Sequence, residues 1–307
     1  MFFNPYSTTK NSWGYGFMFR RAASGQVDMV VVTSSGRWDH RFRAGTGGEA
    51  DEQLASGFLS TFGDGRLDTT TRGSNRLRLV VIGKKGWLFV NGRYAGTLKF
   101  GATAVQGDVE VATGYFRGSE VAGAVTSFEG FTVRTASKKY GPTTGELVLR
   151  QGLIAVHSTD VSVADSIVEA RFFNPSPGQD DWSYGFGIRD RGPNTFDAVF
   201  VRSSKGPYSA QKRSWHHHTR SGTAESDEQL ASSLVSNLST GLRDSNHLLL
   251  IVLGDKAWLF VNDLFTATLN LGVYAEQGDV QAFSGYFNDD EAPGAVIRFQ
   301  DFTVWSP

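Results

Sequence analysis

The chain has 307 residues, with 30 lysines and arginines against 31 aspartates and glutamates and no cysteine. This length suits one or two domains that each bury a core, and the absence of cysteine excludes disulfides, thiolate metal sites and cysteine nucleophiles. A net charge of -1 does not favour nucleic acid as a partner, because that would need a basic face.

The sequence shows no targeting or membrane-spanning segment. Its first residues, MFFNPY, lack the basic and apolar stretches of a secretory signal. The longest apolar runs, such as residues 248–253, are far too short to span a bilayer. We therefore expect no membrane insertion. Of two locations, the cytoplasm or an extracytoplasmic site as part of a longer chain, we favour the second.

Alternating apolar and polar residues predict β-strands in chain order through the first half of the sequence. The predicted strands cover residues 27–32, 77–82, 87–90, 94–100, 109–116 and 125–134. Glycine-containing turns separate some of them, as at residues 83–86 and 91–92. The segment DEQLAS at residues 51–56 is the one helix candidate, short enough for a single turn.

The motifs of the first half return in the same order in the second half. They are FFNP at 2–5 and 172–175, WGYGF and WSYGF at 13–17 and 182–186, DEQLAS at 51–56 and 227–232, WLFVN at 87–91 and 258–262, and QGDV at 106–109 and 277–280. Such self-similarity indicates tandem duplication of one domain. Many short strands and almost no helix favour an antiparallel sandwich for each copy.

We predict a first repeat over residues 1–134, a polar linker over 135–144 and a second repeat over 145–307. The second repeat carries two alternating apolar runs within residues 145–171, and the first repeat has no counterpart of them. The first repeat is therefore expected to lack its N-terminal strands. Either the sequence starts inside a longer protein, which we favour, or a partner chain supplies the missing strands to an open sheet edge.

The WLFVN strand, the following Gly-Asp-Val and the closing Phe-Thr-Val strand resemble those of the concanavalin A-like lectin/glucanase (laminin-G-like) jelly rolls. Modules of this family are appended to bacterial kinases and surface proteins. The sequence is also similar to the domain group linked to keto-disaccharide hydrolysis. The resemblance covers residues 2–134 and 145–305 and implies an all-β fold of two tandem antiparallel β-sandwiches. Its motifs are mostly turn and core residues, so they say more about fold than about activity.

The sequence lacks the paired carboxylates of a glucanase. Such enzymes hold an acid and a nucleophile or base about 5 to 10 Å apart, which requires acidic residues at alternating positions of one strand. Glu110 stands alone on its predicted strand, and the second repeat replaces it with Gln281. We therefore expect a protein that is not an enzyme.

Two features raise the question of a bound metal ion. In the run from Trp215 to His218, His216 and His218 would share one face of a strand, but a stable site needs further ligands. A polar sheet face near a binding groove is the favoured interpretation. The acidic residues Asp289, Asp290 and Glu291 suit a calcium loop. Solvated acids are favoured there, so we expect no cofactor.

The candidate binding residues surround two tryptophans, Trp38 and Trp215, that lie among charged and polar residues. A flat indole ring can stack on the apolar face of a sugar while polar neighbours bind its hydroxyl groups. An aromatic side chain paired across strands explains the pattern equally well. The polar candidates are Arg20, His40, Arg41 and Arg43 in the first repeat and Arg189, His217, His218 and Arg220 in the second.

The sequence thus predicts a non-catalytic tandem binding module, with carbohydrate at a cell surface as the first choice of ligand. Two weak sites on one chain raise avidity when both engage one polymer. The alternative is an interaction or assembly module that binds a protein. A glycan-processing enzyme of the keto-disaccharide type is the third hypothesis.

Overall fold

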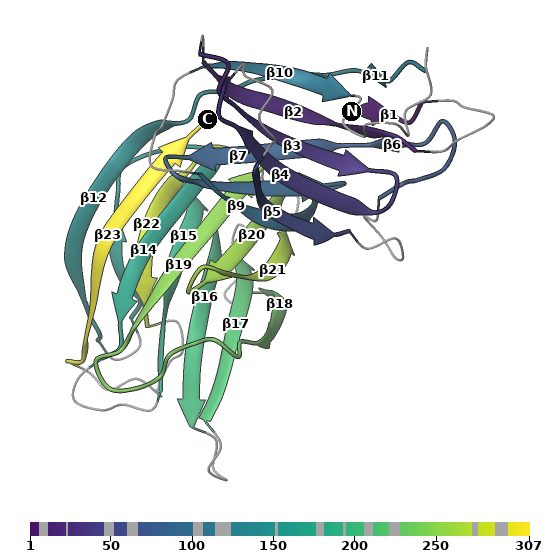
Figure 1. Cartoon of the computed structure of the whole chain (residues 1–307). Coiled ribbons are helices and arrows are strands. Elements are labelled where there is room, and N and C mark those ends of the chain that lie inside the picture. Colours follow the sequence, from purple (N-terminus) through teal and green to yellow (C-terminus); the bar gives the residue numbers. More distant parts are fainter. Residues whose placement is uncertain are drawn as a thin grey trace. The chain divides into compact units, whose positions relative to one another are not determined.

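A computed structural model describes most of the chain (Figure 1). The described residues are 1–5, 12–22, 24–45, 52–59, 67–100, 107–113, 124–150, 153–175, 181–192, 195–205, 211–220, 228–271, 276–285 and 294–307. They form two compact units, Met1–Arg134 and Thr135–Pro307, called here the first and the second unit. Every regular element in these ranges is a β-strand. They contain no helix long and apolar enough to cross a membrane.

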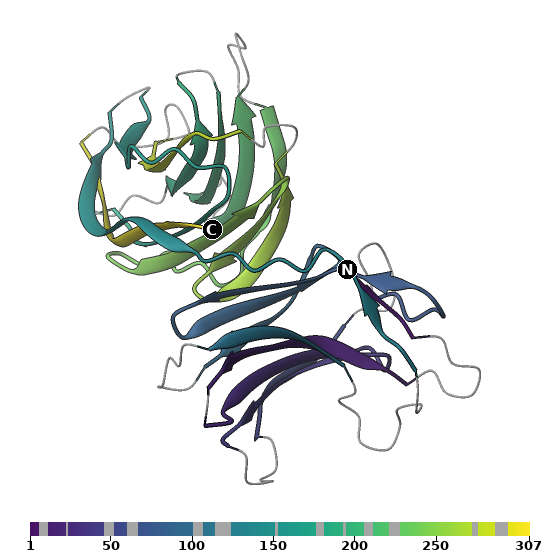
Figure 2. The same cartoon turned by 90° about the horizontal axis from the view of Figure 1, so that it is seen from above.

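The second unit contains two six-stranded antiparallel sheets (Figures 1 and 2). The first sheet is formed, in spatial order, by β12 (Ser137–Val148), β23 (Val296–Ser306), β14 (Ser166–Phe173), β19 (Ser245–Leu253), β20 (Lys256–Val261) and β21 (Leu264–Asn270). The second sheet is formed by β13 (Ala155–Ser158), β22 (Asp279–Ser284), β15 (Trp182–Asp190), β16 (Phe196–Lys205), β17 (Gln211–Arg220) and β18 (Glu228–Leu234). The chain passes six times between the sheets, which confirms the predicted jelly-roll sandwich.

Period-two alternation builds the core of the second unit. Along β15, Trp182, Tyr184 and Phe186 point inward, and along β19 Leu248 and Leu250 do the same. All five are at most 2% exposed. Because successive side chains of a strand point to opposite faces, each of these strands keeps its other side chains outside the core. The side chains of each strand thus fall into two sets, one facing the core and one facing away from it.

The first unit contains the same kinds of strand in smaller sheets. A five-stranded sheet is formed, in spatial order, by β10 (Asp108–Thr113), β2 (Gly14–Arg21), β3 (Val27–Thr33), β4 (Arg37–Arg43) and β5 (Glu52–Phe58). Two three-stranded sheets are formed by β7 (Leu77–Ile82), β8 (Lys85–Val90) and β9 (Arg93–Lys99) and by β11 (Ser127–Phe128), β1 (Phe2–Phe3) and β6 (Ser74–Asn75). Inward side chains from all three sheets meet in one core.

Three local predictions were wrong. The strand predicted for residues 125–134 is reduced to β11 at Ser127–Phe128. The DEQLAS segments are not helical: Glu52–Phe58 and Glu228–Leu234 form the edge strands β5 and β18. An edge strand pairs on one side only. Most side chains of these two strands are exposed, so their sequences lack the alternation of apolar and polar residues on which strand prediction relies. The predicted linker at residues 135–144 is largely strand, because β12 starts at Ser137 and pairs with β23.

A buried hydrogen-bond network recurs in both units and explains several repeated motifs. In the second unit, the Tyr184 hydroxyl donates to Oδ1 of Asn174 at 2.8 Å and accepts from Nδ2 of Asn246 at 2.6 Å. Oδ1 of Asn246 accepts from Nδ2 of Asn262 at 2.8 Å. The network therefore joins the three motifs FFNP, WSYGF and WLFVN by hydrogen bonds. The first unit makes the same bonds with Asn4, Tyr15, Asn75 and Asn91.

Burial keeps the two tyrosines of this network protonated. It raises the pKa of Tyr184 far above its usual value, and it also raises the pKa of Tyr15. Each hydroxyl therefore remains a donor as well as an acceptor at any pH at which the fold is stable. Because partly satisfied buried polar groups are costly, the network favours one arrangement of the strands that it joins.

Replacement of Asn246 by alanine tests this network. The change removes the buried bonds that Asn246 makes with the Tyr184 hydroxyl, the Asn262 amide and the Ser239 backbone. We expect the free energy of unfolding of the second unit to fall by about 1–3 kcal/mol, measured by urea unfolding. Arg298→Ala is the control: Arg298 is exposed and pairs with Glu146, so its loss should cost under about 1 kcal/mol. Equal effects of the two changes would contradict the role of the network.

Candidate functional site

The two candidate tryptophans lie in the cores, which corrects the prediction that they stack on a sugar. Trp38 is 4% exposed and Trp215 is 7% exposed. A Cβ atom on Gly57 of β5 or on Gly96 of β9 would lie 2.5 or 2.0 Å from atoms of the Trp38 ring. The Trp38 ring therefore fills the space between two sheets. Trp215 packs in the core of the second unit in the same way.

Two of the predicted polar ligands in the first unit are also turned inward. Nε2 of His40 lies 3.0 Å from Oδ1 of Asp28, and the His40 side chain is fully buried. A guanidinium nitrogen of Arg20 lies 3.6 Å from the other oxygen of Asp28. Arg20 also lies over the ring of Phe100, 5.1 Å from its centroid. These groups bind one another inside the sandwich, which corrects their assignment to a surface site.

The second unit repeats this cluster. Nε2 of His217 lies 3.2 Å from Oδ1 of Asp197, with both side chains at most 2% exposed. Nε of Arg189 donates to the Ala164 carbonyl at 3.1 Å, and the guanidinium also donates to the Gly254 carbonyl. Burial lowers the pKa of Arg189, and the charge of Asp197 opposes that shift. Arg189 and His217 therefore belong to the interior and not to a ligand site.

A backbone feature explains why both arginines turn inward at the end of a strand. Arg20 and Arg189 have φ values of 58° and 56°, in the left-handed region that few residues with a side chain adopt. Gly107 and Gly278 lie directly against this backbone, where a Cβ atom would come within 2.3 Å of Arg21 and Arg189 atoms. The glycine of the repeated Gly-Asp-Val motif thus makes room for the left-handed backbone at Arg20 and Arg189.

Three of the remaining predicted residues, Arg41, Arg43 and His218, lie on the opposite, outward face of their strands. Arg41 and Arg43 alternate with the inward side chains of β4, and His218 is the counterpart of Arg41 on β17. Arg220 ends β17, and its side chain lies outside the described part of the structure. The predicted site therefore mixes two faces. Arg41 and Arg43 are partly exposed, whereas His218 is buried at 8% exposure.

A row of side chains crosses the outward face of the second sheet of the second unit. Strand pairing aligns, from β18 to β13, Ser232, His216, Phe200, Gly185, Phe283 and Val156. His218 lies beside this row, with its ring centroid 5.9 Å from that of His216. We call Phe200, Phe283, His216 and His218 the aromatic face. Sequence reasoning recognised only His218 as a ligand candidate, because the two phenylalanines look like ordinary core residues of alternating strands.

His216 forms the partly exposed part of the aromatic face. Its ring is stacked on Phe200 with centroids 5.2 Å apart and planes 9° apart. Phe200 is fully buried, and a Cβ atom on Gly185 would lie 2.6 Å from its Cβ. Phe200 therefore packs against the backbone of a glycine, and the imidazole of His216 stacks on its ring. The result is a flat ring held parallel to a rigid base.

Hydrogen bonds fix this imidazole in one orientation. Nδ1 of His216 lies 3.2 Å from Oε1 of Gln229, and Nε2 lies 2.9 Å from Oγ of Ser214. Because a carbonyl oxygen only accepts, Nδ1 carries the hydrogen and Nε2 accepts from the serine. Burial lowers the pKa of His216, and the charges of Arg202 and Lys212 lower it further, against the effect of Gln229. The ring is therefore neutral at pH 7.

The equivalent face of the first unit has a different chemistry. Its matching row is formed by Ser56, Asp39, Val31, Gly16 and Ala112. Asp39 thus takes the place of His216, and Val31 the place of Phe200. Arg41 and Glu110 occupy the next row. The inward side chains, in contrast, are the same pairs of tryptophan, histidine and aspartate in both units.

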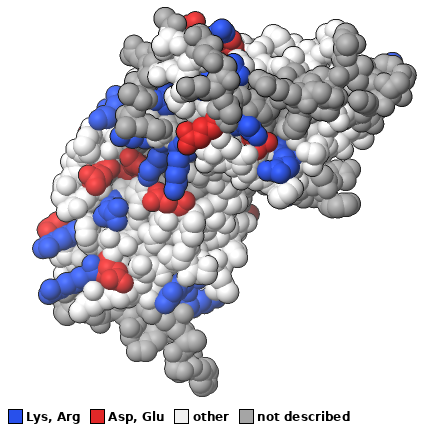
Figure 3. All heavy atoms as spheres, in the orientation of Figure 1, with Lys and Arg blue, Asp and Glu red and all other residues white. Residues whose placement is uncertain are grey.

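Charged residues do not gather by sign on the surface in view. Figure 3 shows basic and acidic side chains of the described residues interspersed over that face.

Two carboxylates do meet near the aromatic face: Asp190 and Asp279 both accept from the amide of Gln281. Asp279 also accepts from Thr159 Oγ1 at 3.0 Å and from the Val161 amide at 3.1 Å. These bonds give Asp279 a role in anchoring the segment that follows β13.

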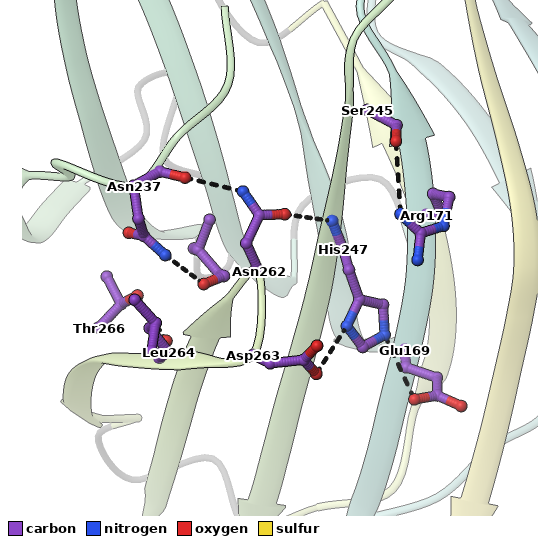
Figure 4. A network of polar contacts seen from close by, with 10 residues as sticks. Glu169, Arg171, Asn237, Ser245, His247, Asn262, Asp263, Leu264 and Thr266 are labelled. Carbon is purple, nitrogen blue, oxygen red and sulfur yellow. Dashed lines mark hydrogen bonds and ion pairs between the residues drawn. The ribbon is translucent and has the colours of Figure 1, made fainter.

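A second polar cluster lies on the outward side of the other sheet of the second unit (Figure 4). His247 of β19 lies between two carboxylates: Nε2 is 3.4 Å from Glu169 and Nδ1 is 3.3 Å from Asp263. Asp263 follows Asn262 in the turn after β20, and both residues have positive φ values. Sequence reasoning missed this cluster because its members come from three separate strands and turns.

The described residues contain no group of three or more histidine, cysteine, aspartate or glutamate side chains placed to hold a metal ion. His216 and His218 share a face as predicted, but both nitrogens of His216 are engaged by Ser214 and Gln229. Asp289, Asp290 and Glu291 lie outside the described residues. The prediction of solvated acids in that loop, with a calcium ion as the alternative, therefore stays a prediction.

No family model and no curated protein matches the sequence. Several solved structures are similar in fold. The carbohydrate binding module CBM66 from Bacillus subtilis is 13% identical with a TM-score of 0.41, over 56% of this chain and 95% of its own. The endo-beta-1,3-glucanase from Pyrococcus furiosus is 14% identical with a TM-score of 0.36, over 53% and 74%. The alginate lyase Aly36B is 9% identical with a TM-score of 0.37, over 55% and 83%.

Replacement of Trp215 by alanine separates a core role from a ligand role. Because the ring is buried between the sheets, its removal leaves a cavity, and we expect a loss of about 3–5 kcal/mol in the free energy of unfolding. Leu234→Ala is the control, since Leu234 is 69% exposed on the neighbouring strand and should change stability little. Chemical unfolding followed by circular dichroism measures both. A Trp215→Ala protein of unchanged stability would contradict the core assignment.

Proposed function

We propose that the chain is a non-catalytic carbohydrate-binding module and that its second unit binds sugar on the aromatic face. The observation that carries the proposal is the half-buried His216 ring, stacked on Phe200 and fixed by Ser214 and Gln229. A flat neutral ring offers a surface for the C–H face of a pyranose. Binding to a ring already fixed in place costs little conformational entropy.

The neighbours of His216 suit a ligand rich in hydroxyl groups. Ser232 and Gln229 are exposed beside it on β18, and the amide of Gln229 donates to Oγ of Ser232 at 3.3 Å. Amides and hydroxyls both donate and accept hydrogen bonds, as sugar hydroxyls do. Arg202 lies in the adjacent row, paired with Ser214. This set recognises a polyol without requiring a charged ligand.

The absence of an enzymatic role is part of the proposal. Gln281 of β22 stands where the first repeat has Glu110, so β22 carries an amide in place of that carboxylate. Asp279 is held by several donors in a structural role. These features support binding without turnover.

Replacement of His216 by alanine tests the proposed site. We expect affinity for the best ligand in a panel of oligosaccharides to fall at least about tenfold, equivalent to about 1.4 kcal/mol, by calorimetry. The matched control is Asp39→Ala, the same position on the first unit, which should leave affinity unchanged. Wild-type affinity in the His216→Ala protein, or no glycan bound by the wild type, would refute the proposal. The second result would favour a protein ligand.

The proposed site also predicts a pH dependence. The pKa of His216 is lowered from 6.5, so the ring stays neutral in the folded protein while a free histidine would already be protonated. Protonation removes the acceptor that Ser214 donates to. We expect affinity to be constant at and above pH 6.5 and to decline only below it, because the folded pKa lies lower. Affinity that rises as the pH falls through this range would contradict the assignment.

A further inference from the structure

The hairpin formed by β16 and β17 extends beyond the rest of its sheet (Figure 1). The neighbouring strands stop earlier, since β15 pairs with β16 as far as Ser203 and β18 pairs with β17 as far as Ser214. Beyond these points, residues 204–205 pair with residues 211–212. The second unit therefore carries a short two-stranded ribbon at one end of this sheet.

The first unit has no such extension. Its matching hairpin of β3 and β4 ends with the pair of Thr33 and Arg37, which corresponds to the pair of Arg202 and Ser214 in the second unit. The first unit nevertheless packs the same kinds of inward side chain into one core. The extension is therefore not required by the sandwich that both units share.

The extension is rich in basic residues. The sequence of residues 202–213, RSSKGPYSAQKR, contains four basic residues and no acidic one, and we call it the basic ribbon. Asp180 and Asp181, which precede β15 in the sequence, offset part of this charge. The pair of Asp190 and Asp279 lies at the opposite end of the sheet, since Asp190 ends β15 and Trp182 begins it. The end of the sheet that carries the basic ribbon is therefore positive.

Two of these basic residues lie on the same face as His216. Alternation from Phe200 places Arg202 outward, one row from His216 and about 7 Å along the strands. Lys212 is exposed one row further along, four residues before His216 on β17. Burial lowers the pKa of His216, and the charges of Arg202 and Lys212 lower it further, so both charges act at the imidazole. A ligand that lies along the strands from His216 would pass both cations.

We propose that the second unit binds an acidic oligosaccharide, with one sugar ring on His216 and the carboxylate or sulfate groups of adjacent sugars at Arg202 and Lys212. This inference rests on the proposed sugar site and names its class of ligand. Arginine donates paired hydrogen bonds to an oxyanion, and lysine adds a point charge. Opposite charges on the two partners also speed their encounter.

A sugar fits this surface better than a nucleic acid does. Nucleic acid carries a phosphate at every nucleotide and is held by many cations along its backbone. Here the cations are few, and the side chains beside His216 are Ser214, Gln229 and Ser232, which match hydroxyl groups. Widely spaced acidic groups on a polyol chain therefore suit the face.

The probes for the full-length chain are a hexamer of a uronic acid and its carboxyl-reduced, neutral form, compared by calorimetry. At an ionic strength of about 0.1 M, where the screening length is about 10 Å, we expect the acidic hexamer to bind at least about tenfold more tightly. At about 1 M salt the screening length falls to about 3 Å, and the preference should nearly vanish. A sulfated hexamer of the same linkage shows which of the two anions is preferred.

A double variant locates the preference in the basic ribbon. Arg202→Gln combined with Lys212→Gln should bring the ratio of the acidic to the neutral affinity close to one, because both cations are lost. The matched control combines Arg171→Gln with Arg298→Gln, which removes two exposed cations from the other sheet. This control should keep the wild-type ratio.

The outcomes separate this inference from the proposed function. Equal affinity of the wild type for the acidic and the neutral hexamer would overturn the inference and leave sugar binding intact. Binding of neither hexamer would overturn both. The wild-type ratio in the Arg202→Gln and Lys212→Gln double variant would also overturn the inference. Equally tight binding of a single-stranded oligonucleotide with the same number of charges would do so too, because charge alone would then explain the preference.

Discussion

The two faces of each β-strand set the constraint on which the rest of the structure depends. Inward side chains must fill the same space in both units, and Trp38 and Trp215 or His40 and His217 do so with the same residue types. Outward side chains are free of this requirement, and His216 stands where the first unit has Asp39. A binding role is therefore best sought on the outward face, where the two units differ.

Much of the fold was predictable from the sequence, since alternation and the internal repeat indicate strands that pack as sandwiches. The direction in which a given side chain points was not. Trp38 and Trp215 have polar neighbours in the sequence because successive residues of a strand face opposite sides. Polar neighbours therefore do not indicate whether the tryptophan itself faces the solvent or the core. The inward turn of Arg20 and Arg189 depends on a left-handed backbone that local sequence does not reveal.

The candidate site was only partly accessible from the sequence for a related reason. The aromatic face is assembled by cross-strand register, which places Phe200 beside His216 and Phe283 across Gly185. Such neighbours are distant in the chain, and no local pattern joins them. The repeated core positions, in contrast, were predictable, because the same motifs return in the same order in the two halves of the sequence.

The most direct test of the account is to follow the imidazole signals of His216 and His40 by nuclear magnetic resonance while an oligosaccharide is added. His216 is partly exposed on the outward face of β17 in the second unit, whereas His40 is fully buried in the first unit. The account predicts a saturable shift of the His216 signals with those of His40 unchanged. Saturable binding that leaves His216 unchanged would contradict it.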